Sequence, residues 1–551
     1  MFRSDRLVSP LIAIALIVAV VAMQQWPLLE LRGVWWADEA RHAAVLDEMV
    51  QHGEWLALHL NGQYYPDKPP IWFWLLGGFK ALTGLDSAVV LFSGLAASVL
   101  GFALALWHMA RQITGHTGVA LLAVLVALSG SYFVFATHYA RMDFLFSALI
   151  FLSWAAFFRA AGPQPDRAAT LAGFGFAAVA LLVKGPFGLA LPLAAFVVHL
   201  GLNRRLSRLA DRSTLAGLAM VAALGGLWLA LLALRLGPDA VAGLLQGQVI
   251  DRAAKDGGPA SNPLRYLIFL PLMLMPWTAV LLAPTRPFRA LPCTPPEALG
   301  WLLAASLSGL AVLSAVGEKH EYYLLPLLGP VSILIAGSLA AMPFSGIRRV
   351  AIGGGLLLAL PALALQGLLM APGLLALDPL LDGLPAALRL PSLTILIAGL
   401  AVILAGGRLK ALIGLVVVSQ TAFATLALRA SQPFLDPYLN PAIIAAPMRP
   451  LITQGHVPVV VHGIDGVFQH ALGQRYLHLT SAANLWERLA DTPHAVIALE
   501  SGQWRDLPET GGRALGLIAC PRFIGTHFIL LATPPLPDTP PILPAAPCPA
   551  P

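Results

Sequence analysis

Two stretches near the start of the chain, residues 35–48 (WWADEARHAAVLDE) and residues 64–70 (YYPDKPP), decide how the rest is interpreted. The first follows a long apolar run, and both carry several ionisable side chains. Of the 551 residues in the chain, 58% are hydrophobic and only 11% are charged. Soluble domains contain roughly 45–50% apolar and about 25% charged residues. The composition therefore indicates an integral membrane protein, in which clustered ionisable groups need a specific explanation.

Apolar runs of about 17–25 residues recur between short polar breaks, and this is the length that a helix needs to cross a bilayer. We therefore expect an α-helical membrane domain at residues 1–429 with about thirteen transmembrane helices. The first run, LVSPLIAIALIVAVVAM, is long enough to span, and no small-residue cleavage site follows it. It predicts an uncleaved helix. No internal repeat is visible, which argues against a transporter built from repeats.

The polar breaks predict the orientation of the chain. One class of breaks is rich in arginine and falls on alternate sides of successive helices: Arg3 and Arg6, Arg111, Arg159 and Arg167, Arg204–Arg212, Arg286 and Arg289, Arg348 and Arg349, and Arg408 and Lys410. Because basic loops are retained in the cytoplasm, we expect the N-terminus to be cytoplasmic. After an odd number of spans, the C-terminal region would be periplasmic. The net charge of +6 has the same origin and does not imply a nucleic-acid partner.

The opposite class of breaks carries mixed charge. Its members are the Asp38–Lys68 loop, the Arg141–Asp143 turn, Lys184, the Asp251–Lys255 loop and GEKHEYY at residues 317–323. Solubility alone does not require arginine-rich loops on one side of the membrane and loops of mixed charge on the other. The outer face is therefore where we expect the chemistry of the protein to lie.

The pattern changes from about residue 430. Four short apolar segments are typical of strands, and SAANLWERLA between them predicts a helix: VPVVVHG (457–463), RYLHL (475–479), AVIALES (495–501) and FILLAT (528–533). We expect a small periplasmic α/β domain at 430–535 and a proline-rich tail at 536–551, extended or disordered. In a periplasmic domain Cys520 and Cys548 could form a disulfide, and two unpaired thiols are the alternative. Cys293 falls in a proposed cytoplasmic loop.

The first periplasmic loop, residues 27–85, begins with a predicted interfacial helix. One interpretation needs no chemistry: Asp38 or its neighbour caps the helix, alanines form an apolar face, and Arg41, Asp47 and Glu48 face water. That interpretation does not account for the second half of the loop. There an Asp-Lys pair is followed by two prolines, which fix the backbone and start the next helix.

The order of motifs in this loop resembles the bacterial aminoarabinose (4-amino-4-deoxy-L-arabinose) lipid A transferases. That family belongs with the protein O-mannosyltransferase-like enzymes of the GT-C glycosyltransferase fold. The matching motifs are Asp38-Glu39-x-Arg41, Glu48-Met49, Gly53-x-Trp55, Asn61-Gly62-x-Tyr64 and Lys68-Pro69-Pro70. Looser matches follow in the same order: ARMDFLF around Asp143, LLVKGP around Lys184, PLMLMPW around Trp277, and KHEYYLLPLLGP from Lys319. One residue departs from the pattern, because Asp67 stands where glutamate is expected before the lysine.

The resemblance implies a polyprenyl-phosphate-sugar-dependent glycosyltransferase, a hexosyl or pentosyl transferase, in the bacterial inner membrane. It implies transfer of the sugar to a hydroxyl or phosphate of an acceptor on the periplasmic face. A lipid A-like glycolipid is the closest family precedent, and other glycans or a protein could serve as acceptors in the same framework.

Such a reaction needs a carboxylate that orients or deprotonates the acceptor. Asp38 is the first candidate, because it lies at the edge of the first span and the resemblance puts the family's essential aspartate there. Glu39 is a second candidate that the sequence does not separate from it. Asp143 is a candidate supporting carboxylate, and the alternative for Asp143 is an N-cap.

The reaction also needs positive charge for the leaving phosphate. The candidate phosphate ligands are Arg41, Lys68, Arg252, Lys319, Tyr322 and Tyr323. Arginine can bind two phosphate oxygens, lysine acts as a point charge, and a tyrosine hydroxyl can donate. Bland alternatives stay open: Lys68 could extend to the interface, Arg252 could lie in a solvated loop, and Lys319 could pair with Glu321. Lys184 could be only a helix-end residue.

Asp67 is the candidate ligand of a divalent cation that would bridge to the phosphate. No second histidine stands at metal spacing from His320, so the sequence does not indicate a zinc site. No other cofactor is indicated.

Two other classes of function fit part of the sequence. A lipid or lipid-linked-sugar flippase also needs many spans, but it predicts ionisable residues near helix midpoints. An assembly subunit without chemistry would not need DE-x-R and KPP in a single loop. Because the charges fall at predicted helix ends on one face, the sequence favours a reaction at the outer interface.

Overall fold

The computed structural model describes residues 9–247, 262, 264–288, 294–317, 319–490, 492, 494–506 and 515–533. The predicted Asp251–Lys255 loop, Cys293 and the tail at 536–551 lie outside these residues.

Nine helical segments among the described residues are long and apolar enough to cross a membrane. They are α1 (Pro10–Leu31), α4 (Ser87–Thr114), α7 (Asp143–Ala160), α8 (Arg167–Lys184), α10 (Arg212–Leu236), η6 (Glu321–Leu324) with α15 (Leu325–Ala341), α16 (Phe344–Met370), α17 (Leu384–Ala405) and α18 (Leu409–Leu439). Five shorter apolar helices accompany them: α3 (Ile71–Thr83), α5 (Thr117–Leu128), α9 (Phe187–Leu202), α14 (Ala298–Ser314) and α19 (Ala442–Thr453). The protein is therefore a multi-pass membrane protein, as predicted. The number of about thirteen spans stays a prediction.

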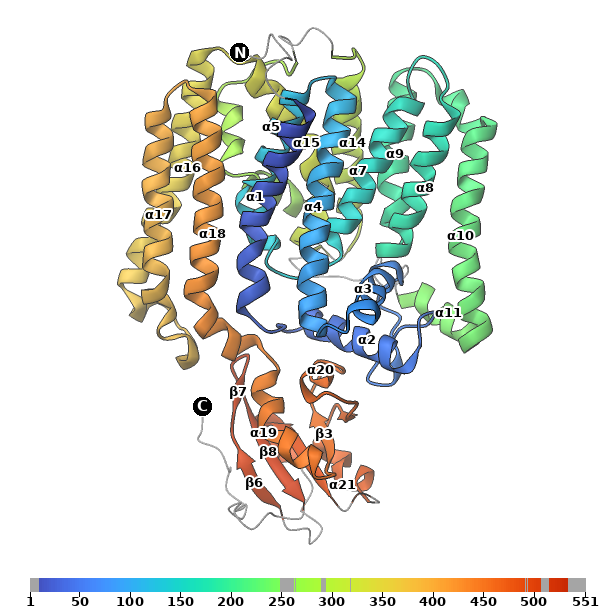
Figure 1. Cartoon of the computed structure of the whole chain (residues 1–551), viewed down its shortest axis with the longest axis vertical. Coiled ribbons are helices and arrows are strands. Elements are labelled where there is room, and N and C mark those ends of the chain that lie inside the picture. Colours follow the sequence, from blue (N-terminus) through green and yellow to red (C-terminus); the bar gives the residue numbers. More distant parts are fainter. Residues whose placement is uncertain are drawn as a thin grey trace.

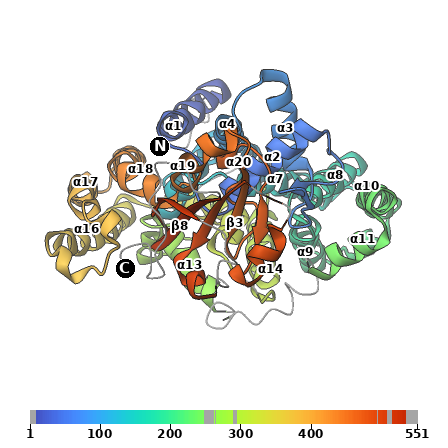
Figure 2. The same ribbon diagram turned by 90° about the horizontal axis from the view of Figure 1, so that it is seen from below.

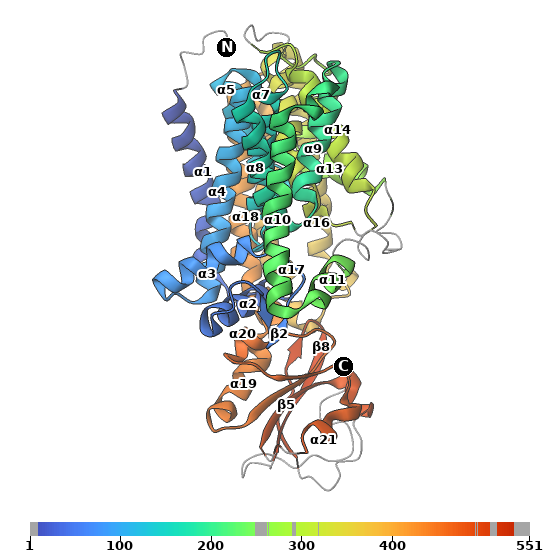
Figure 3. The same cartoon turned by 90° about the vertical axis from the view of Figure 1, so that its right-hand side faces the viewer.

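The long helices run side by side in one bundle (Figure 1, Figure 3). Helices α16 and α17 form one side of the bundle, and α8, α9 and α10 form the other (Figure 1). The start of the chain lies at one end of the bundle, and the C-terminal domain lies at the opposite end. Seen from that end, the domain covers the middle of the bundle (Figure 2).

The first loop folds against the end of the bundle that carries the C-terminal domain (Figure 1). It contains α2 (Asp38–His52), a hairpin of β1 (His59–Leu60) and β2 (Gln63–Tyr64), and α3. The hairpin turn is Asn61-Gly62, and both residues have positive φ, 52° and 78°. A two-residue hairpin turn of this kind favours Asn-Gly, so the N-G motif of the sequence sets the shape of the loop.

The C-terminal domain is built on a sheet with the strand order β4-β3-β5-β8-β6. The strands are β3 (Val457–Val461), β4 (Leu477–Leu479), β5 (Ala495–Glu500), β6 (Gly516–Ala519), β7 (Arg522–Phe523), which pairs with β8 alone, and β8 (Thr526–Thr533). Strand β3 runs parallel to β4 and β5, and β8 runs antiparallel to β5 and β6. Nearly every residue of β3 and β5 is buried, which explains their continuous apolar sequences.

The predicted strands and the α/β character of this domain are confirmed. The predicted SAANLWERLA helix is shorter, a 3-10 turn at Ala482–Asn484 followed by α21 (Leu485–Arg488). Helix α18 continues to Leu439, so the helical bundle extends past the predicted limit at residue 430. Cys520 takes part in a disulfide, and because Cys548 lies outside the described residues, their pairing stays a prediction.

The C-terminal domain is docked on the first loop through polar contacts of α2. Both oxygens of Glu48 accept from the Arg475 guanidinium at 2.6 and 2.8 Å, and Oε1 also accepts from Nε2 of Gln469, on α20 (Gln469–Leu472), at 2.8 Å. Oδ2 of Asp47 lies 2.7 Å from Nδ1 of His470. The expectation that Asp47 and Glu48 face water is therefore wrong, because both carboxylates bind the C-terminal domain.

The hairpin turn adds to this interface. The Asn61 amide donates to Asp465 and to the backbone oxygen of Tyr476, and its oxygen accepts from the Tyr476 N–H, all at 2.8–2.9 Å. Glu48 and Asn61, which belong to the matching motifs of the first loop, thus help to position the C-terminal domain.

We expect Glu48→Ala to weaken this docking by about 2 kcal/mol, since it leaves the Gln469 amide and the Gly62 N–H without their acceptor and removes the partner of the half-exposed Arg475. Hydrogen exchange in β3 and β4 should accelerate, and the thermal unfolding midpoint should fall. Glu54→Ala is the control, because Glu54 pairs with an exposed Arg235 side chain and such a pair contributes little. Equal exchange in the two variants would contradict the docking role of Glu48.

Candidate functional site

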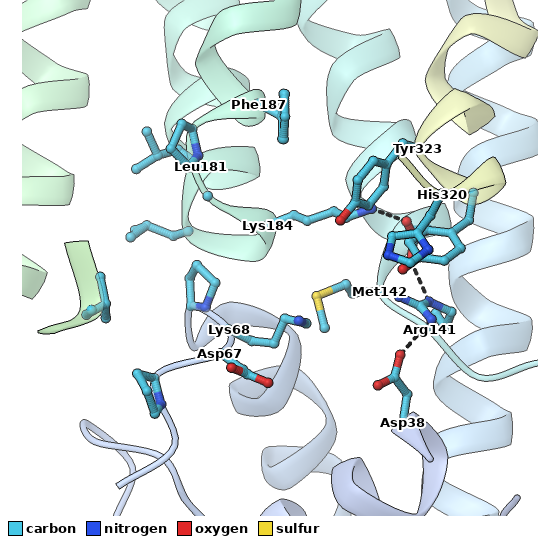
Figure 4. Close-up of a pocket in the computed structure, with 18 of the residues that line it drawn as sticks. Asp38, Asp67, Lys68, Arg141, Met142, Leu181, Lys184, Phe187, His320 and Tyr323 are labelled. Atoms are coloured by element: carbon cyan, nitrogen blue, oxygen red, sulfur yellow. Dashed lines mark hydrogen bonds and ion pairs between the residues drawn. The ribbon is translucent and has the colours of Figure 1, made fainter. Parts of the chain in front are cut away.

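A cavity of about 830 Å³ lies at the end of the bundle nearest the first loop. Its polar end is lined by Asp38, Asp67, Lys68, Arg141, Asp143, Lys184 and His320, and its apolar wall by Leu181, Leu182, Phe187, Ala190, Trp228 and Leu229. Figure 4 shows the side chains of Lys68, Arg141 and Lys184 directed into the same space. The cavity therefore joins a charged cluster to an apolar surface formed by α8, α9 and α10.

Asp38 is the first residue of α2 and lies opposite Arg141 in the cavity. Its Oδ2 is 2.6 Å from Nη1 of Arg141 (Figure 4). Its backbone N–H donates to the hydroxyl of Tyr139 at 3.1 Å. Helix α2 has no side-chain cap, so the interpretation of Asp38 as a helix cap is wrong. Its carboxylate is part of the cavity instead.

The surroundings of Asp38 set its protonation state. Burial alone would raise its pKa, but the Arg141 guanidinium, followed by His42, Lys68 and Arg41, lowers the pKa to about 2. The carboxylate is therefore ionised at neutral pH and is a weak base while Arg141 stays beside it.

Asp143 is the first residue of α7 and is buried. It forms an ion pair with Lys184, and its Oδ2 accepts from Nε of Arg141 at 3.2 Å. Met142 occupies the N-cap position and no side chain caps α7, so the interpretation of Asp143 as an N-cap is also wrong. Arg141 thus bridges the two carboxylates of the cavity.

Lys184 reaches the cavity because α8 ends there. Gly185 has a φ of 81°, which a residue with a side chain rarely adopts, and Pro186 follows as the N-cap residue of α9. The break places the ammonium group between Asp143 and two aromatic rings. Lys184 is therefore more than a helix-end residue.

Two tyrosines of η6 pack against the cations. The guanidinium carbon of Arg141 lies 3.7 Å from the ring centre of Tyr322, and Nζ of Lys184 lies 4.5 Å from that of Tyr323. These are cation–π contacts, which hold a cation without neutralising it. Both tyrosines line the cavity, as the prediction that they are phosphate ligands requires.

The first loop supplies Asp67 and Lys68 to the opposite side of the cavity (Figure 4). Nη2 of Arg41 donates to Oδ2 of Asp67 at 3.0 Å, and Arg41 itself is not among the lining residues. Arg41 therefore acts on the cavity through Asp67 and through its charge.

Comparison with known proteins gives a consistent set of similarities. Residues 67–228 match the family described as dolichyl-phosphate-mannose-protein mannosyltransferase. The undecaprenyl phosphate-alpha-4-amino-4-deoxy-L-arabinose arabinosyl transferase of Aeromonas salmonicida is 29% identical over 58% of this chain and 59% of its own length. The enzyme of the same name from Edwardsiella ictaluri is 28% identical over 62% of each chain. The match spans about three-fifths of the length of these relatives.

The crystal structure of ArnT from Cupriavidus metallidurans bound to undecaprenyl phosphate superposes with a TM-score of 0.75. The superposition covers 94% of this chain and 97% of that chain at 19% sequence identity. The chain shares the fold of that structure. It has the GT-C fold that the first-loop motifs predict.

Some of the candidate residues do not line the cavity. The Glu39 carboxylate is buried and accepts from Arg32 at 2.6 and 2.7 Å, and from the Trp35 and Ala140 N–H groups at 2.9 and 2.6 Å. It ties the loop before α2 to the loop before α7. The geometry separates the two acidic neighbours that the sequence leaves equivalent, and Asp38 is the one that lines the cavity.

Lys319 is not among the described residues that line the cavity. It is buried and donates to the backbone oxygen of Val316. The expected partner of Lys319, Glu321, pairs with Arg265. Arg252 lies outside the described residues, so its role stays a prediction.

Sequence reasoning missed three residues of the cavity: Arg141, Lys184 and His42. Arg141 and Lys184 stand in the looser motifs, but no phosphate role was assigned to either of them. A physical signal is present for Arg141, since a buried Asp143 needs a positive partner and Arg141 stands two residues before it. No comparable signal marks His42.

The surroundings of Asp67 do not suit a divalent cation. Among the described residues, no group of three or more His, Cys, Asp or Glu side chains could hold a metal ion. Asp67 is paired with Arg41, and Lys68 is its neighbour. A divalent cation needs several oxygen ligands, and nearby positive charges oppose its binding. The donor set does not fit, and no step below involves a metal.

Proposed function

We propose that this protein is a glycosyltransferase that moves a sugar from a polyprenyl-phosphate donor to a hydroxyl or phosphate of a lipid A-like glycolipid. The observation that carries the proposal is a single cavity that joins Asp38 and a cation cluster to an apolar wall. The relatives named as undecaprenyl phosphate-aminoarabinose transferases support the choice of donor and sugar. So does the undecaprenyl phosphate bound to the superposed structure.

The charge of the cavity suits the donor. The lining cations Lys68, Arg141 and Lys184 balance the lining carboxylates Asp38, Asp67 and Asp143. Arg41, which pairs with Asp67 from outside the lining, adds one positive charge. A lipid-phosphate-sugar diester carries one negative charge, and its phosphate gains a second as the sugar leaves. The excess positive charge favours the bound diester, and it favours the doubly charged phosphate that leaves more strongly.

The apolar wall suits the lipid part of the donor. Leu181 and Phe187 flank the break between α8 and α9, and Trp228 faces the cavity from α10. Burial of hydrocarbon against such a surface contributes roughly 25 cal/mol per Å². The phosphate would then lie at the polar end while the chain extends along the helices.

The transfer exchanges one bond at the anomeric carbon. An acceptor oxygen forms a bond to that carbon, and the carbon–oxygen bond to phosphate breaks with its electron pair going to the phosphate oxygen. With a hydroxyl acceptor, the proton goes to the Asp38 carboxylate. Lys68, Arg141 and Lys184 stabilise the phosphate dianion that leaves.

Binding of the donor would also change Asp38. In the free protein burial raises the pKa of Asp38, but nearby cations lower it. Arg141 has the largest lowering effect, and Lys68 adds to it. A phosphate that draws these cations weakens their effect on Asp38 and leaves burial, which raises the pKa. Asp38 would thus become a stronger base only when the donor is in place.

We further propose that the N-terminus is cytoplasmic and that the cavity and the C-terminal domain are periplasmic, in the bacterial inner membrane. The arginine-rich loops support this orientation.

We expect Asp38→Asn to reduce transfer at least about 1,000-fold, which is within the range for loss of a catalytic base. Transfer from undecaprenyl phosphate-linked aminoarabinose to lipid A would be measured in proteoliposomes. The asparagine has nearly the same shape and Arg141 keeps its bond to Asp143, so the variant should elute as a folded protein with a moderately lower unfolding midpoint. Wild-type turnover by this variant would remove Asp38 from the mechanism.

Lys68→Ala should raise the dissociation constant for undecaprenyl phosphate by roughly 10- to 100-fold, because a charged hydrogen bond contributes about 1.5–3 kcal/mol. Lys80→Ala is the matched control, since Lys80 lies in the same loop but pairs with Asp47 outside the cavity. Binding as tight in Lys68→Ala as in Lys80→Ala would show that Lys68 does not hold the phosphate.

A single-cysteine experiment tests the orientation. Gln63 and Ser207 are both exposed, at the loop end and the arginine-rich end of the bundle respectively. In intact spheroplasts, a membrane-impermeant maleimide should label Gln63→Cys above the wild-type background and should not label Ser207→Cys. The reverse pattern would invert the topology.

A further inference from the structure

His42 occupies an unusual position in the cavity. It follows Asp38 by one turn of α2, so both side chains lie on the same face of the helix. It lines the cavity and is only 1% exposed. Its ring packs edge-on against Phe73, with a centroid distance of 5.3 Å. The imidazole is therefore fixed at the polar end, next to the proposed base.

Neither ring nitrogen of His42 has a hydrogen-bond partner among the described residues. Other buried histidines of the described chain use at least one nitrogen: His138 and His456 contact backbone oxygens of Val134 and Leu451 through Nδ1. Buried polar groups are bonded in the large majority of cases, and one that is not needs an explanation. A ligand that enters the cavity would supply the missing partner.

The charge state of His42 limits what that ligand can be. Burial lowers the pKa of His42 to about 3, and Lys68, Arg141 and Arg41 add to the effect against the opposing influence of Asp38. The ring is therefore neutral at physiological pH, with one N–H donor and one nitrogen acceptor. A phosphate oxygen only accepts and has four cations nearby, whereas a hydroxyl group both donates and accepts.

We propose that His42 binds a sugar hydroxyl of the donor or of the acceptor beside Asp38 and thereby contributes to recognition of that substrate. This inference rests on the proposed function, because it assumes that a sugar enters the polar end of the cavity. The hydroxyl belongs either to the sugar of the donor or to the acceptor, and the chemistry of recognition is the same for both. His42 acts on the sugar and not on the phosphate, which separates its role from that of Lys68.

The test compares two lipids on the purified full chain. Dissociation constants are measured for sugar-free undecaprenyl phosphate and for undecaprenyl phosphate-linked aminoarabinose, and the KM for lipid A is measured in proteoliposomes. The variants are His42→Phe and His42→Leu, which remove both nitrogens with an aromatic and an aliphatic side chain, and His42→Gln, which keeps a donor and an acceptor. His52→Phe is the matched control, because His52 lies on the same helix but outside the cavity.

We expect His42→Phe and His42→Leu to weaken binding of the sugar-bearing lipid by roughly 3- to 10-fold, the range for one hydrogen bond. Binding of the sugar-free lipid should not change, His42→Gln should restore most of the loss, and His52→Phe should match the wild type. If donor affinity is kept and the KM for lipid A rises by a similar factor instead, the hydroxyl belongs to the acceptor and the proposal holds.

Two results would overturn the proposal. One is unchanged donor affinity and unchanged KM in a folded His42→Phe or His42→Leu variant, which would mean that no substrate group bonds to the ring. The other is equal weakening for both lipids, which would mean a general packing role. A wild-type protein that binds neither lipid would instead refute the proposed function, so the two failures are distinguishable.

Discussion

The pairing of charge inside the cavity is the constraint on which the rest of the site depends. An ion removed from water costs several kcal/mol unless it is paired and hydrogen-bonded. Arg141 is bonded to both Asp38 and Asp143, and Asp143 is also bonded to Lys184. Loss of any one of these groups would leave another buried charge without its partner.

The helices around the cavity add to this pairing. Asp38 and Asp143 are the first residues of α2 and α7, where the helix dipole favours negative charge. Lys184 is the last residue of α8, where the dipole favours positive charge. Three helix ends thus meet with the charge that each end stabilises. This arrangement explains why so charge-poor a chain concentrates ionisable residues at one end of the bundle.

The first loop is informative because α2 serves two surfaces at once. Asp38 at its start faces the cavity, while Asp47 and Glu48 near its end bind the C-terminal domain. The helix therefore holds a fixed relation between the site and a domain more than 400 residues away in the sequence. A change in how that domain docks would be transmitted to Asp38 through a rigid element.

The sequence alone predicts the class of fold, the α/β domain and the end of the bundle that holds the site. It also places Asp38, Asp143, Lys68 and two tyrosines of η6 among the candidates, and these all line the cavity. It does not separate Asp38 from Glu39, because neighbours on a helix point about 100° apart and the pattern does not say which direction is the cavity. It also wrongly predicts that Glu48 faces water. The partner Arg475 is remote in the sequence, and the amphipathic pattern of a helix does not indicate a remote partner.

The position of the charges favours the proposed transferase over a flippase. A protein that carries a lipid-linked sugar across the membrane needs polar groups along a path through the bilayer, near helix midpoints. In the described part of the chain the cavity's charges lie instead at helix ends and in loops, at the end that carries the C-terminal domain. A carboxylate fixed against its counter-ion there has no evident use in transport. It has one in a reaction where an arriving phosphate takes up the counter-ion and leaves the carboxylate to accept a proton.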